Sequence, residues 1–551
     1  MANYLSYIPL GGMGEVTKNL HVYEYDNQIL IVDCGLGFAN ETMIGVDLLL
    51  PDSSYLVKAV QQGKKIVGMV ITHGHEDHFG ALPFILPQLP EFPIYATSFT
   101  TAMANAKLSD FQLKPVIKKI EFGQPVEIGP FSCTFIRVTH SVPDTAHIFI
   151  KTPVGNFYHG SDFKFDFTPW DGQKADFQAI AKAGMEGVRA LMSESLGADR
   201  PGHTPSEMTL TEHFRQAIRE CHGKFIVTTY SSNVSRLNQV LAVADEMNKY
   251  VCFVGRSLMK VKDLARQQGI LRLRKEREIR PDQVKKYPEK DVVLFVAGSQ
   301  GQEDSALMRM VNGLHRDITI GQQDMVVISA DPIPGNETSV NSLINELSRM
   351  KINVQLNIDD HFHVSGHGSQ NDHLLLLSLL RPKQVVPISG DFRHMSAYKE
   401  LAMGFGYEDH DVLLLSGGQE VTFSQEQARF GQKITLRQVY VDEISGEEVE
   451  QYALHDRKRI SQEGIVAIIA QIDSEDGSLV EKPEVVARGL SAKEAQDIDK
   501  SVSEAISKSF STQKNIRDWG YIRKQIREIA ERRIFQEFKR RPLVFPVVIE
   551  V

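Results

Sequence analysis

The sequence predicts an α/β protein built from several domains. At about 150 residues per domain, a chain of 551 residues suggests three or four units. Short β-rich runs broken by Gly and Asp dominate residues 1–165, whereas strands and helices alternate over residues 205–355, which is typical of a parallel sheet. Hydrophobic residues make up 42% and charged residues 24% of the chain, which excludes wholesale disorder and fibrous classes.

The first part of the chain is predicted to form strands that end in polar or glycine-containing turns. Such turns are expected where the strands of a sheet carry functional loops. The β-rich runs are residues 28–32, 65–71, 92–96, 131–139 and 147–152.

The middle of the chain is predicted to be a parallel sheet with helices between its strands. Each apolar run there is followed by a segment with the period of an amphipathic helix. The strands are expected at residues 224–229, 250–254, 292–297 and 325–329. The pattern continues with a strand at 352–358, a helix at 372–380 and a strand at 384–388.

The end of the chain is predicted to be a small α+β domain that follows a linker. Residues 425–460 are polar and charged, which suits a linker. The later elements are a strand at 465–472, helices at 491–510 and 515–538, and a last strand at 543–551.

Charge is distributed unevenly along the chain. The formal net charge of −9 disfavours nucleic acid as a partner when the chain is taken as a whole. Residues 256–286, however, contain eleven Lys and Arg against four Asp and Glu, and residues 514–541 contain ten against four. Such basic segments either bind phosphates or form solvated helix faces.

Composition also limits the location of the protein. The leucine-rich run at residues 374–380 is far shorter than a membrane span, and no export signal is visible. The four cysteines show no CxxC spacing, which fits a reducing compartment and argues against a cysteine zinc site. We therefore expect a soluble cytoplasmic protein with no membrane partner.

The most informative segment is rich in metal-binding side chains. The sequence His73-Gly-His75-Glu-Asp77-His78 follows the apolar run at residues 68–71. In an extended segment His73, His75 and Asp77 point the same way, and a helix beginning near Asp77 turns His78 to an adjacent direction. Three imidazoles and two carboxylates within six residues suit divalent ions, zinc above all.

Two later residues fit the same pattern. His140 ends a β-rich run, and Asp162 follows another strand-like segment. Taken alone, His140 would be a structural histidine and Asp162 a turn residue. The residues by themselves lead to a binuclear metallohydrolase and no further.

With these motifs the sequence resembles the metallo-β-lactamase fold hydrolases, and within them the beta-CASP nucleases of the ribonuclease J family. The HGHEDH motif alone identifies only the superfamily, whereas its combination with the later motifs is much more specific. Those motifs are PLGGMGE (residues 9–15), VDCG (32–35), HSVPD (140–144), SSNVSR (231–236), GRS (255–257), GSQG (298–301), SADPIPGNE (329–337), VSGHGSQ (364–370) and the terminal KRRPLVFPVVIEV.

The resemblance implies an α/β fold in which a metallo-β-lactamase αββα sandwich contains an inserted α/β beta-CASP domain and is followed by a small α+β C-terminal domain. The sandwich is expected from residues 1–205 and 356–424, and the beta-CASP domain from residues 206–355. Residues 425–460 would be the linker, and residues 461–551 the C-terminal domain, which is expected to mediate oligomerisation.

The resemblance also implies two divalent metal sites. The expected ligands are His73, His75, Asp77, His78, His140 and Asp162. The first ion would be held by the three histidines His73, His75 and His140, the second by Asp77 and His78, and Asp162 would bridge the two. Asp33 would orient ligands from behind. Two such ions polarise a phosphodiester and supply hydroxide from a bound water.

Residues outside the metal site are expected to contact RNA. By resemblance they are Ser232, Asn233, Arg256, Ser365, His367, Gly368 and Ser369. His367 would contact the scissile phosphate and assist departure of the leaving group, and it would act in catalysis together with Asp77, His78 and Asp162. The glycines and hydroxyls of GHGSQ before the helix at residue 372 also suggest an anion site at the N-terminus of that helix.

The chain departs from the family pattern at two positions. Ser389 stands where relatives carry a histidine that binds the second metal, and Ser235 replaces another common histidine. Because a serine hydroxyl is a poor zinc ligand, the second ion is expected to bind more weakly than the first, and Mn²⁺ or Mg²⁺ can replace Zn²⁺ there.

The implied activity is that of a metal-dependent ribonuclease in RNA processing and decay. The resemblance implies 5′-to-3′ exonuclease action favouring 5′-monophosphate RNA, together with endonuclease cleavage. Three alternatives stay open: a weakly active or non-catalytic paralogue that pairs with an active ribonuclease J, a DNA-processing beta-CASP nuclease, and a small-molecule hydrolase. Expected partners are RNA and further copies of the chain in a homodimer or homotetramer, or a paralogue in a hetero-oligomer.

Overall fold

The structure is a computed structural model that describes residues 4–39, 43–333, 335–357, 361–442, 447–511 and 518–551. The chain divides into two units, which are treated separately below. The first contains Met1–Asn40 and Leu48–Val439, and the second contains Glu41–Asp47 and Tyr440–Val551.

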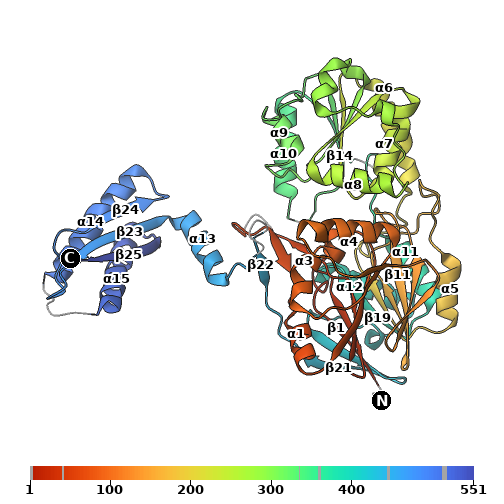
Figure 1. Cartoon of the computed structure of the whole chain (residues 1–551), viewed down its shortest axis with the longest axis horizontal. Coiled ribbons are helices and arrows are strands. Elements are labelled where there is room, and N and C mark those ends of the chain that lie inside the picture. The colour runs from red at the N-terminus through yellow and green to blue at the C-terminus, as the bar shows by residue number, and fades with distance from the viewer. Residues whose placement is uncertain (1–3, 40–42, 334, 358–360, 443–446, 512–517) are drawn as a thin grey trace. The chain divides into compact units, whose positions relative to one another are not determined.

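Two β-sheets form the base of the first unit (Figure 1). The eight-stranded sheet runs in the order β21-β20-β1-β2-β3-β6-β7-β8, and the six-stranded sheet in the order β19-β13-β12-β11-β10-β9. The strands of the first sheet are β1 (Leu5–Pro9), β2 (His21–Tyr25), β3 (Gln28–Val32), β6 (Lys65–Ile71), β7 (Ile94–Ala96), β8 (Ile117–Lys119), β20 (Gln419–Phe423) and β21 (Ala428–Lys433). Those of the second are β9 (Pro125–Ile128), β10 (Phe131–Arg137), β11 (Ala146–Thr152), β12 (Gly155–Gly160), β13 (Ala190–Glu194) and β19 (Gln384–Ile388).

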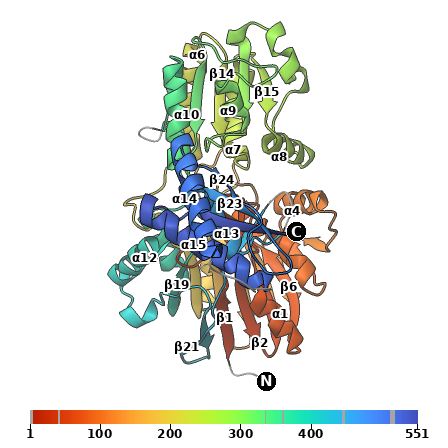
Figure 2. The same cartoon turned by 90° about the vertical axis from the view of Figure 1, so that its left-hand side faces the viewer.

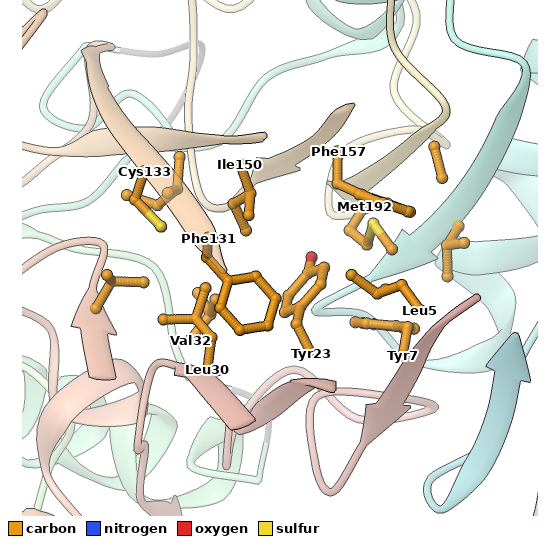
Figure 3. Close-up of a cluster of buried hydrophobic side chains, with 14 of the residues drawn as sticks. Leu5, Tyr7, Tyr23, Leu30, Val32, Phe131, Cys133, Ile150, Phe157 and Met192 are labelled. Carbon is orange, nitrogen blue, oxygen red and sulfur yellow. The ribbon is translucent and has the colours of Figure 1, made fainter. Parts of the chain in front are cut away.

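The core of this base lies between the two sheets. Tyr23 and Leu30 of the first sheet meet Phe131, Phe157 and Met192 of the second, and all five side chains are buried (Figure 3). The associated helices are α1 (Ser54–Gln61), α2 (Glu76–Phe79), α3 (Leu82–Ile85), α4 (Ser98–Asp110), α5 (Phe177–Met185), α11 (Gln370–Leu380) and α12 (Phe392–Phe405). These layers confirm the predicted sandwich.

The inserted domain is a parallel five-stranded sheet in the order β15-β16-β14-β17-β18. Alternate residues of each strand face opposite sides, and helices α6, α7 and α8 pack on one side while α9 and α10 pack on the other. Figure 2 shows the same domain turned by 90°. Its elements are α6 (Leu210–Glu220), β14 (Phe225–Thr229), α7 (Val234–Glu246), β15 (Tyr250–Val254), α8 (Arg256–Gln267), β16 (Val292–Val296), α9 (Ala306–Val311), β17 (Met325–Ser329), α10 (Glu337–Arg349) and β18 (Asn353–Gln355).

The second unit is a three-stranded sheet covered by helices on one face. The central strand β23 (Ile465–Ile472) alternates strictly between buried and half-buried residues, so it has one covered and one open face. It pairs with β24 (Glu484–Arg488) and with β25 (Leu543–Glu550). The helices are α13 (Gln451–Glu463), α14 (Ala492–Phe510) and α15 (Trp519–Phe538), and α14 and α15 supply the buried contacts to the sheet.

Some expected elements differ from those observed. The strand expected at 352–358 is shorter, because β18 covers only Asn353–Gln355. Three expectations fall partly outside the described residues: residue 358 of this strand, residue 334 of SADPIPGNE, and residues 515–517 of the helix expected at 515–538. The expected linker, residues 425–460, contains β21, the short strand β22 (Val439–Val441) and the start of α13. Because β21 is an edge strand with mostly exposed side chains, its polar sequence carries no strand signal.

The basic segment at residues 256–286 is partly neutralised within the structure, because five of its eleven Lys and Arg residues form ion pairs among the described residues. Lys260 pairs with Asp110, and both Lys262 and Arg266 pair with Glu278. These pairs contribute to the inserted domain and, through Lys260, to its contact with α4. Among the described residues, no helix is long and apolar enough to cross a membrane.

Candidate metal centre

The candidate site lies where strands of both sheets end. His73 follows β6, Asp33 follows β3, His140 follows β10 and Asp162 follows β12. His75 occupies the N-cap position of α2, so the chain turns from a strand into a helix within the HGHEDH motif, as the sequence predicts. Strands from two facing sheets thus bring residues that are distant in sequence to one place.

The first group of ligand atoms comes from three histidines and one carboxylate. His75 Nδ1 lies 3.2 Å from His73 Nε2 and 3.1 Å from His140 Nε2. Asp162 Oδ2 lies 3.7 Å from both His73 Nε2 and His140 Nε2. Four ligands of a tetrahedral zinc site, each about 2.0–2.1 Å from the ion, are separated from one another by about 3.3 Å. The spacing of these four atoms therefore fits such an ion.

The second group shares Asp162 with the first. His78 Nε2 lies 3.4 Å from Asp162 Oδ2 and 3.5 Å from Asp77 Oδ2. The other oxygen of Asp162 is buried and has no hydrogen-bond partner among the described residues. A buried carboxylate oxygen without a partner is unfavourable unless a cation binds it, so this arrangement also fits a metal.

Hydrogen bonds at Nδ1 hold three ligand histidines, His73, His78 and His140, in the tautomer that leaves Nε2 without a proton. His78 Nδ1 donates to Asp33 Oδ2 at 2.7 Å, and His140 Nδ1 donates to the carbonyl of Gly366 at 2.7 Å. Asp33 also accepts from the hydroxyl of Thr72, which in turn lies 3.0 Å from His73 Nδ1. The fully buried Asp33 thus contacts His78 directly and His73 through Thr72. It lies behind the ligands, where the family resemblance implies it.

The pKa values of these groups suit metal binding. Burial holds the pKa of His73 and His140 well below the ordinary value and lowers the pKa of His75 to about 4, so all three are neutral at physiological pH. Burial also acts to lower the pKa of His78, but the carboxylates of Asp162, Asp77 and Asp33 outweigh it and raise that pKa. A cation at the second position would replace the proton on His78.

A histidine–carboxylate pair borders the metal centre. His367 Nδ1 lies 2.7 Å from Glu194 Oε2, and the His367 ring packs edge-on against His140 with centroids 5.0 Å apart. Burial raises the pKa of Glu194 to about 7. Although burial lowers the pKa of His367, the carboxylate of Glu194 outweighs it and raises that pKa to about 9. His367 is therefore protonated at neutral pH and can donate a proton.

Glu194 is a residue of the site that the sequence analysis missed. It is the last residue of β13 and is fully buried, and its other oxygen accepts from the backbone N–H of Phe163. The available signal was a carboxylate just after the apolar run 190–192, near the end of a strand as Asp33 and Asp162 are.

The GHGSQ loop differs from the expected anion site. Its backbone N–H groups already have acceptors within the protein: Gly368 N–H donates to the carbonyl of Phe163, and Ser369 N–H donates to Asp372 Oδ2. Gln370 N–H donates to the carbonyl of Arg200. The Asp372 carboxylate takes the place at the helix N-terminus that a phosphate would need. Groups that remain available to a substrate are therefore side chains, chiefly those of Ser365 and His367.

The RNA-contact residues expected in the inserted domain lie beyond the carboxyl ends of its strands, Ser232 and Asn233 between β14 and α7 and Arg256 at the start of α8. The hydroxyls of Ser231 and Ser257 are 3.1 Å apart, so the loop with Ser232 and the first turn of α8 with Arg256 are adjacent. Arg256 is exposed and lines an open pocket of about 820 Å³. Asn233 is buried, and its side chain caps α7 by accepting from the backbone N–H of Arg236, so it is placed to shape the loop.

The structure places Ser389 and Ser235, the two residues that depart from the family pattern, near the metal centre. Ser389 is buried with a left-handed backbone (φ 49°), and its hydroxyl donates to Asn19 Oδ1 at 2.8 Å. The side-chain nitrogen of Asn19 lies 3.2 Å from His78 Nε2, so Ser389 reaches the second metal position only through Asn19. His394 pairs with Asp391 and belongs to neither ligand group, and Ser235 lines a small cavity beside His140.

Comparisons with known proteins cover most of the chain. The description "Ribonuclease J, beta-CASP domain" matches residues 222–347, and "Ribonuclease J C-terminal domain" matches residues 452–551. The description "Beta-lactamase superfamily domain" matches residues 28–225, and "Zn-dependent metallo-hydrolase RNA specificity domain" matches residues 351–413.

Individual relatives match over nearly the whole length. The chain is 32% identical to ribonuclease J2 of Bacillus subtilis, over 99% of this chain and 98% of that protein, and 34% identical to ribonuclease J of Thermus thermophilus, over 100% and 96%. A crystal structure of a protein of unknown function from Enterococcus faecalis matches 76% of this chain and 100% of its own, with a TM-score of 0.55 at 15% identity. That likeness concerns the fold alone.

Proposed function

Because the chain belongs to the ribonuclease J family and is therefore a metal-dependent nuclease, we propose that it acts as a 5′-to-3′ exonuclease favouring 5′-monophosphate RNA and also as an endonuclease. The reaction is hydrolysis of a phosphodiester. The observation that carries the proposed hydrolysis is the convergence of the two metal-ligand groups on Asp162. The match to an RNA specificity domain at residues 351–413 favours RNA over DNA as the substrate in RNA processing and decay.

The residues of the centre fit a divalent metal and are assigned to it as follows. His73, His75, His140 and Asp162 would hold one ion, and Asp77, His78 and Asp162 the other. Bound there, the ions would supply hydroxide at neutral pH and neutralise charge on the phosphate. We take the first ion to be Zn²⁺, because three of its four ligands are imidazoles, and the second to be more weakly held.

Residues of the chain itself prepare the leaving group. Hydrolysis expels a ribose oxygen, which must gain a proton as the bond to phosphorus breaks. Glu194 holds the His367 ring beside His140 and keeps it protonated, so the proton is in place before the bond breaks. His367 is thus the proposed general acid. Glu194 positions its ring and stabilises its protonated form.

Preference for a 5′ monophosphate gives the first prediction. Ser369 is almost buried, and its hydroxyl lies 2.9 Å from that of Thr204, which also donates to the carbonyl of His367. Through Thr204 this hydroxyl supports the loop that carries Ser365 and His367, the side chains that remain available to a 5′ phosphate. Replacing Ser369 by alanine is therefore expected to reduce the ratio of exonuclease rates on 5′-monophosphate and 5′-triphosphate RNA by about tenfold, the effect of one or two lost hydrogen bonds. RNA affinity should change little. Rates on the two substrates measured side by side provide the test.

A matched control for this change is Ser348→Ala on α10, where the hydroxyl donates only to the carbonyl of Ile344. It should leave the ratio unaltered. Equal rates of the unmodified protein on monophosphate and triphosphate ends would contradict the proposed 5′-end preference, while leaving hydrolysis itself in place.

A second candidate function rests on Ser389. A chain that holds its second ion weakly could serve as a less active subunit that pairs with an active paralogue. The nearly equal identities to a ribonuclease J2 and to a ribonuclease J are compatible with both readings. Metal content and activity of the purified chain discriminate between them.

The second prediction therefore concerns metal content. Ser389 lacks the imidazole of relatives and is hydrogen-bonded to Asn19, so dialysed protein should retain about one zinc per chain and need added Mn²⁺ or Mg²⁺ for full activity. Ser389→His should raise the retained metal toward about two ions per chain and reduce the dependence on added metal. Metal analysis by mass spectrometry after dialysis, with activity titrated against Mn²⁺, measures both effects.

Ser416→His is the control for an added histidine away from the metal centre, because Ser416 is half-buried on a loop and its side chain bonds to Lys433. Two zinc ions that survive dialysis in the unmodified protein would show that another group replaces the missing ligand. If the chain holds an ion at both metal positions at saturating Mn²⁺ and still does not cleave RNA, this result would favour a non-catalytic subunit that pairs with an active paralogue.

Assembly gives the third prediction. The open face of the C-terminal sheet carries apolar side chains, among them Phe545 at 57% and Ile549 at 44% exposure, with Ala467 and Ile469 of β23 beside them. We propose that a second copy of the chain covers this face in a homodimer or homotetramer, because an apolar sheet face of this kind is unfavourable in water. Phe545→Asp is expected to convert the oligomer to monomers in sedimentation velocity.

Tyr521→Asp on α15 is the matched control, since Tyr521 is also exposed in the same unit (46%) but lies outside the sheet. It should sediment as the unmodified protein does. An unchanged sedimentation coefficient for Phe545→Asp would exclude the sheet face as the interface.

A further inference from the structure

A buried arginine joins the inserted domain to the segment that leads back to the metal centre. Arg236 lies in the first turn of α7 and is fully buried, which is rare for an arginine. All three nitrogens of its guanidinium are used as donors. Their acceptors, at 2.8–3.4 Å, are Glu207 Oε1 and Oε2, Ser329 O and Oγ, Phe362 O, His363 Nδ1 and Val364 O.

These acceptors come from three different parts of the chain. Glu207 lies where the chain enters the inserted domain, and Ser329 is the last residue of β17. Phe362, His363 and Val364 belong to the return segment, residues 361–369, which runs back to α11. Arg236 therefore ties both connections of the inserted domain to the carboxyl edge of its sheet.

The return segment carries the groups that act at the metal centre. The carbonyl of Gly366 orients His140, His367 pairs with Glu194, and Gly368 N–H donates to the carbonyl of Phe163. Arg236 holds the segment three to five residues before His367, on the side of the inserted domain. The segment is thus held at both ends, and the position of His367 depends on both.

The charges around Arg236 balance locally, because Arg236 and the nearby Lys164 face two buried carboxylates, Glu207 and Asp166, the latter 4.0 Å from Lys164 Nζ. Glu207 is buried, and although burial raises its pKa, Arg236 and Lys164 outweigh that effect and lower it, so Glu207 is a carboxylate at neutral pH. Lys164 Nζ lies 3.6 Å from Glu207 Oε1 and belongs to the same segment as Asp162. A buried pair of this kind gives little stability by itself, and its geometric specificity is the property to explain.

We propose that Arg236 is a positioning residue for the leaving-group step: it fixes the return segment so that His367 stands beside the scissile bond. This inference rests on the proposed role of His367 as general acid. Lysine cannot replace the guanidinium, because a single ammonium group has at most three donors and cannot reach Glu207, Ser329 and the return segment together.

The test uses two substrates that differ in their need for an acid. RNA expels a ribose oxygen that must be protonated, whereas bis(p-nitrophenyl) phosphate expels a phenolate that leaves without a proton. In the metal-loaded full-length protein, Arg236→Lys is expected to lower kcat on RNA by about 10- to 100-fold, the effect of a displacement of about 1 Å. KM for RNA and the rate on bis(p-nitrophenyl) phosphate should stay within about threefold.

A double-mutant cycle with His367→Ala identifies the route of the effect. If Arg236 acts through His367, Arg236→Lys should cause no further loss of RNA cleavage once His367 is alanine. Additive losses, or an equal loss on both substrates, would overturn the inference. If His367→Ala alone leaves RNA cleavage intact, the proposed acid is wrong, and this failure is distinct from that of the inference.

Two further variants guard against a folding defect. Ser329→Ala is milder than Arg236→Lys: it removes one acceptor of Arg236 and one donor to the carbonyl of Phe362, and it should show the same substrate pattern more weakly. Arg189→Lys is the matched control, because Arg189 is also buried but bonds to Ser424 and Gln384, away from the return segment. Loss of RNA cleavage in Arg189→Lys equal to that in Arg236→Lys would also overturn the inference.

Discussion

Alanine at His75 or at Asp77 is expected to lower RNA cleavage by at least about a thousandfold. Each side chain belongs to one ligand group of the centre, and a bound divalent ion contributes several kcal/mol to transition-state stabilisation, with each factor of ten in rate equal to about 1.4 kcal/mol. Both side chains are only half-buried on a loop and a short helix. Tm should therefore fall by no more than about 5 °C in metal-free protein. Single-turnover cleavage and thermal unfolding measure the two quantities.

Glu76→Gln is the matched control, because Glu76 lies between the two residues and its carboxylate pairs with Lys107, outside both ligand groups. It should retain RNA cleavage within about threefold, as surface ion pairs contribute little. Turnover retained in both His75→Ala and Asp77→Ala would show that the catalytic centre lies elsewhere.

Replacement of His367 by alanine should separate the two kinds of leaving group. General acid catalysis contributes about 10²- to 10⁴-fold, and RNA cleavage is expected to fall by that amount. Hydrolysis of bis(p-nitrophenyl) phosphate should change little, because its leaving group needs no proton. The retained metal should be the same as in the unmodified protein, since the ligand groups for both ions are complete without His367. Kinetics on both substrates and metal analysis test these points.

Glu194→Gln should reproduce part of the loss, because the amide can still accept from His367 Nδ1 but cannot stabilise its positive charge. His373→Ala is a suitable control: His373 is a buried histidine of α11 that bonds to the carbonyl of Leu196. An equal fall on both substrates in His367→Ala would mean that His367 holds the phosphate or the fold and donates no proton.

Strands buried on both faces were the easiest part of the fold to predict. The runs at β3, β15, β17 and β19 are continuous and apolar, and their predicted bounds coincide with those observed. The strand β21 shows the opposite case. It is an edge strand of polar residues, paired on one side only, so neither its composition nor its periodicity differs from that of a loop.

The convergence of the candidate metal ligands could be predicted because they are rare residue types at strand ends. The groups that orient those ligands could not, because their role depends on contacts over long sequence separations. Asn19 meets Ser389, and Arg236 meets Phe362, across more than a hundred residues in each case. The backbone N–H groups of the GHGSQ loop were expected to bind phosphate. Asp372, in the first turn of the following helix α11, already accepts a hydrogen bond from the N–H of Ser369.

The position of the insertion has a consequence for synthesis of the protein. When residue 205 has been added, the chain already contains His73, His75 and His140, but β19 and β20, which pair with β13 and β1, have not been made. At about 5–20 residues per second, the ribosome needs about 10–40 s more to reach the end of β20. During that interval two strand edges of the nascent sandwich lack their partners, which exposes the chain to aggregation.

The same interval separates the metal ligands from the residues that complete them. Gly366, which orients His140, and His367 follow the whole inserted domain, so a nascent chain that bound metal would still lack its proposed general acid. The ribosome must translate about two-thirds of the message before these two residues exist. A chain whose proposed active site is completed this late is expected not to cleave RNA near the ribosome, including its own transcript, while most of it is being made.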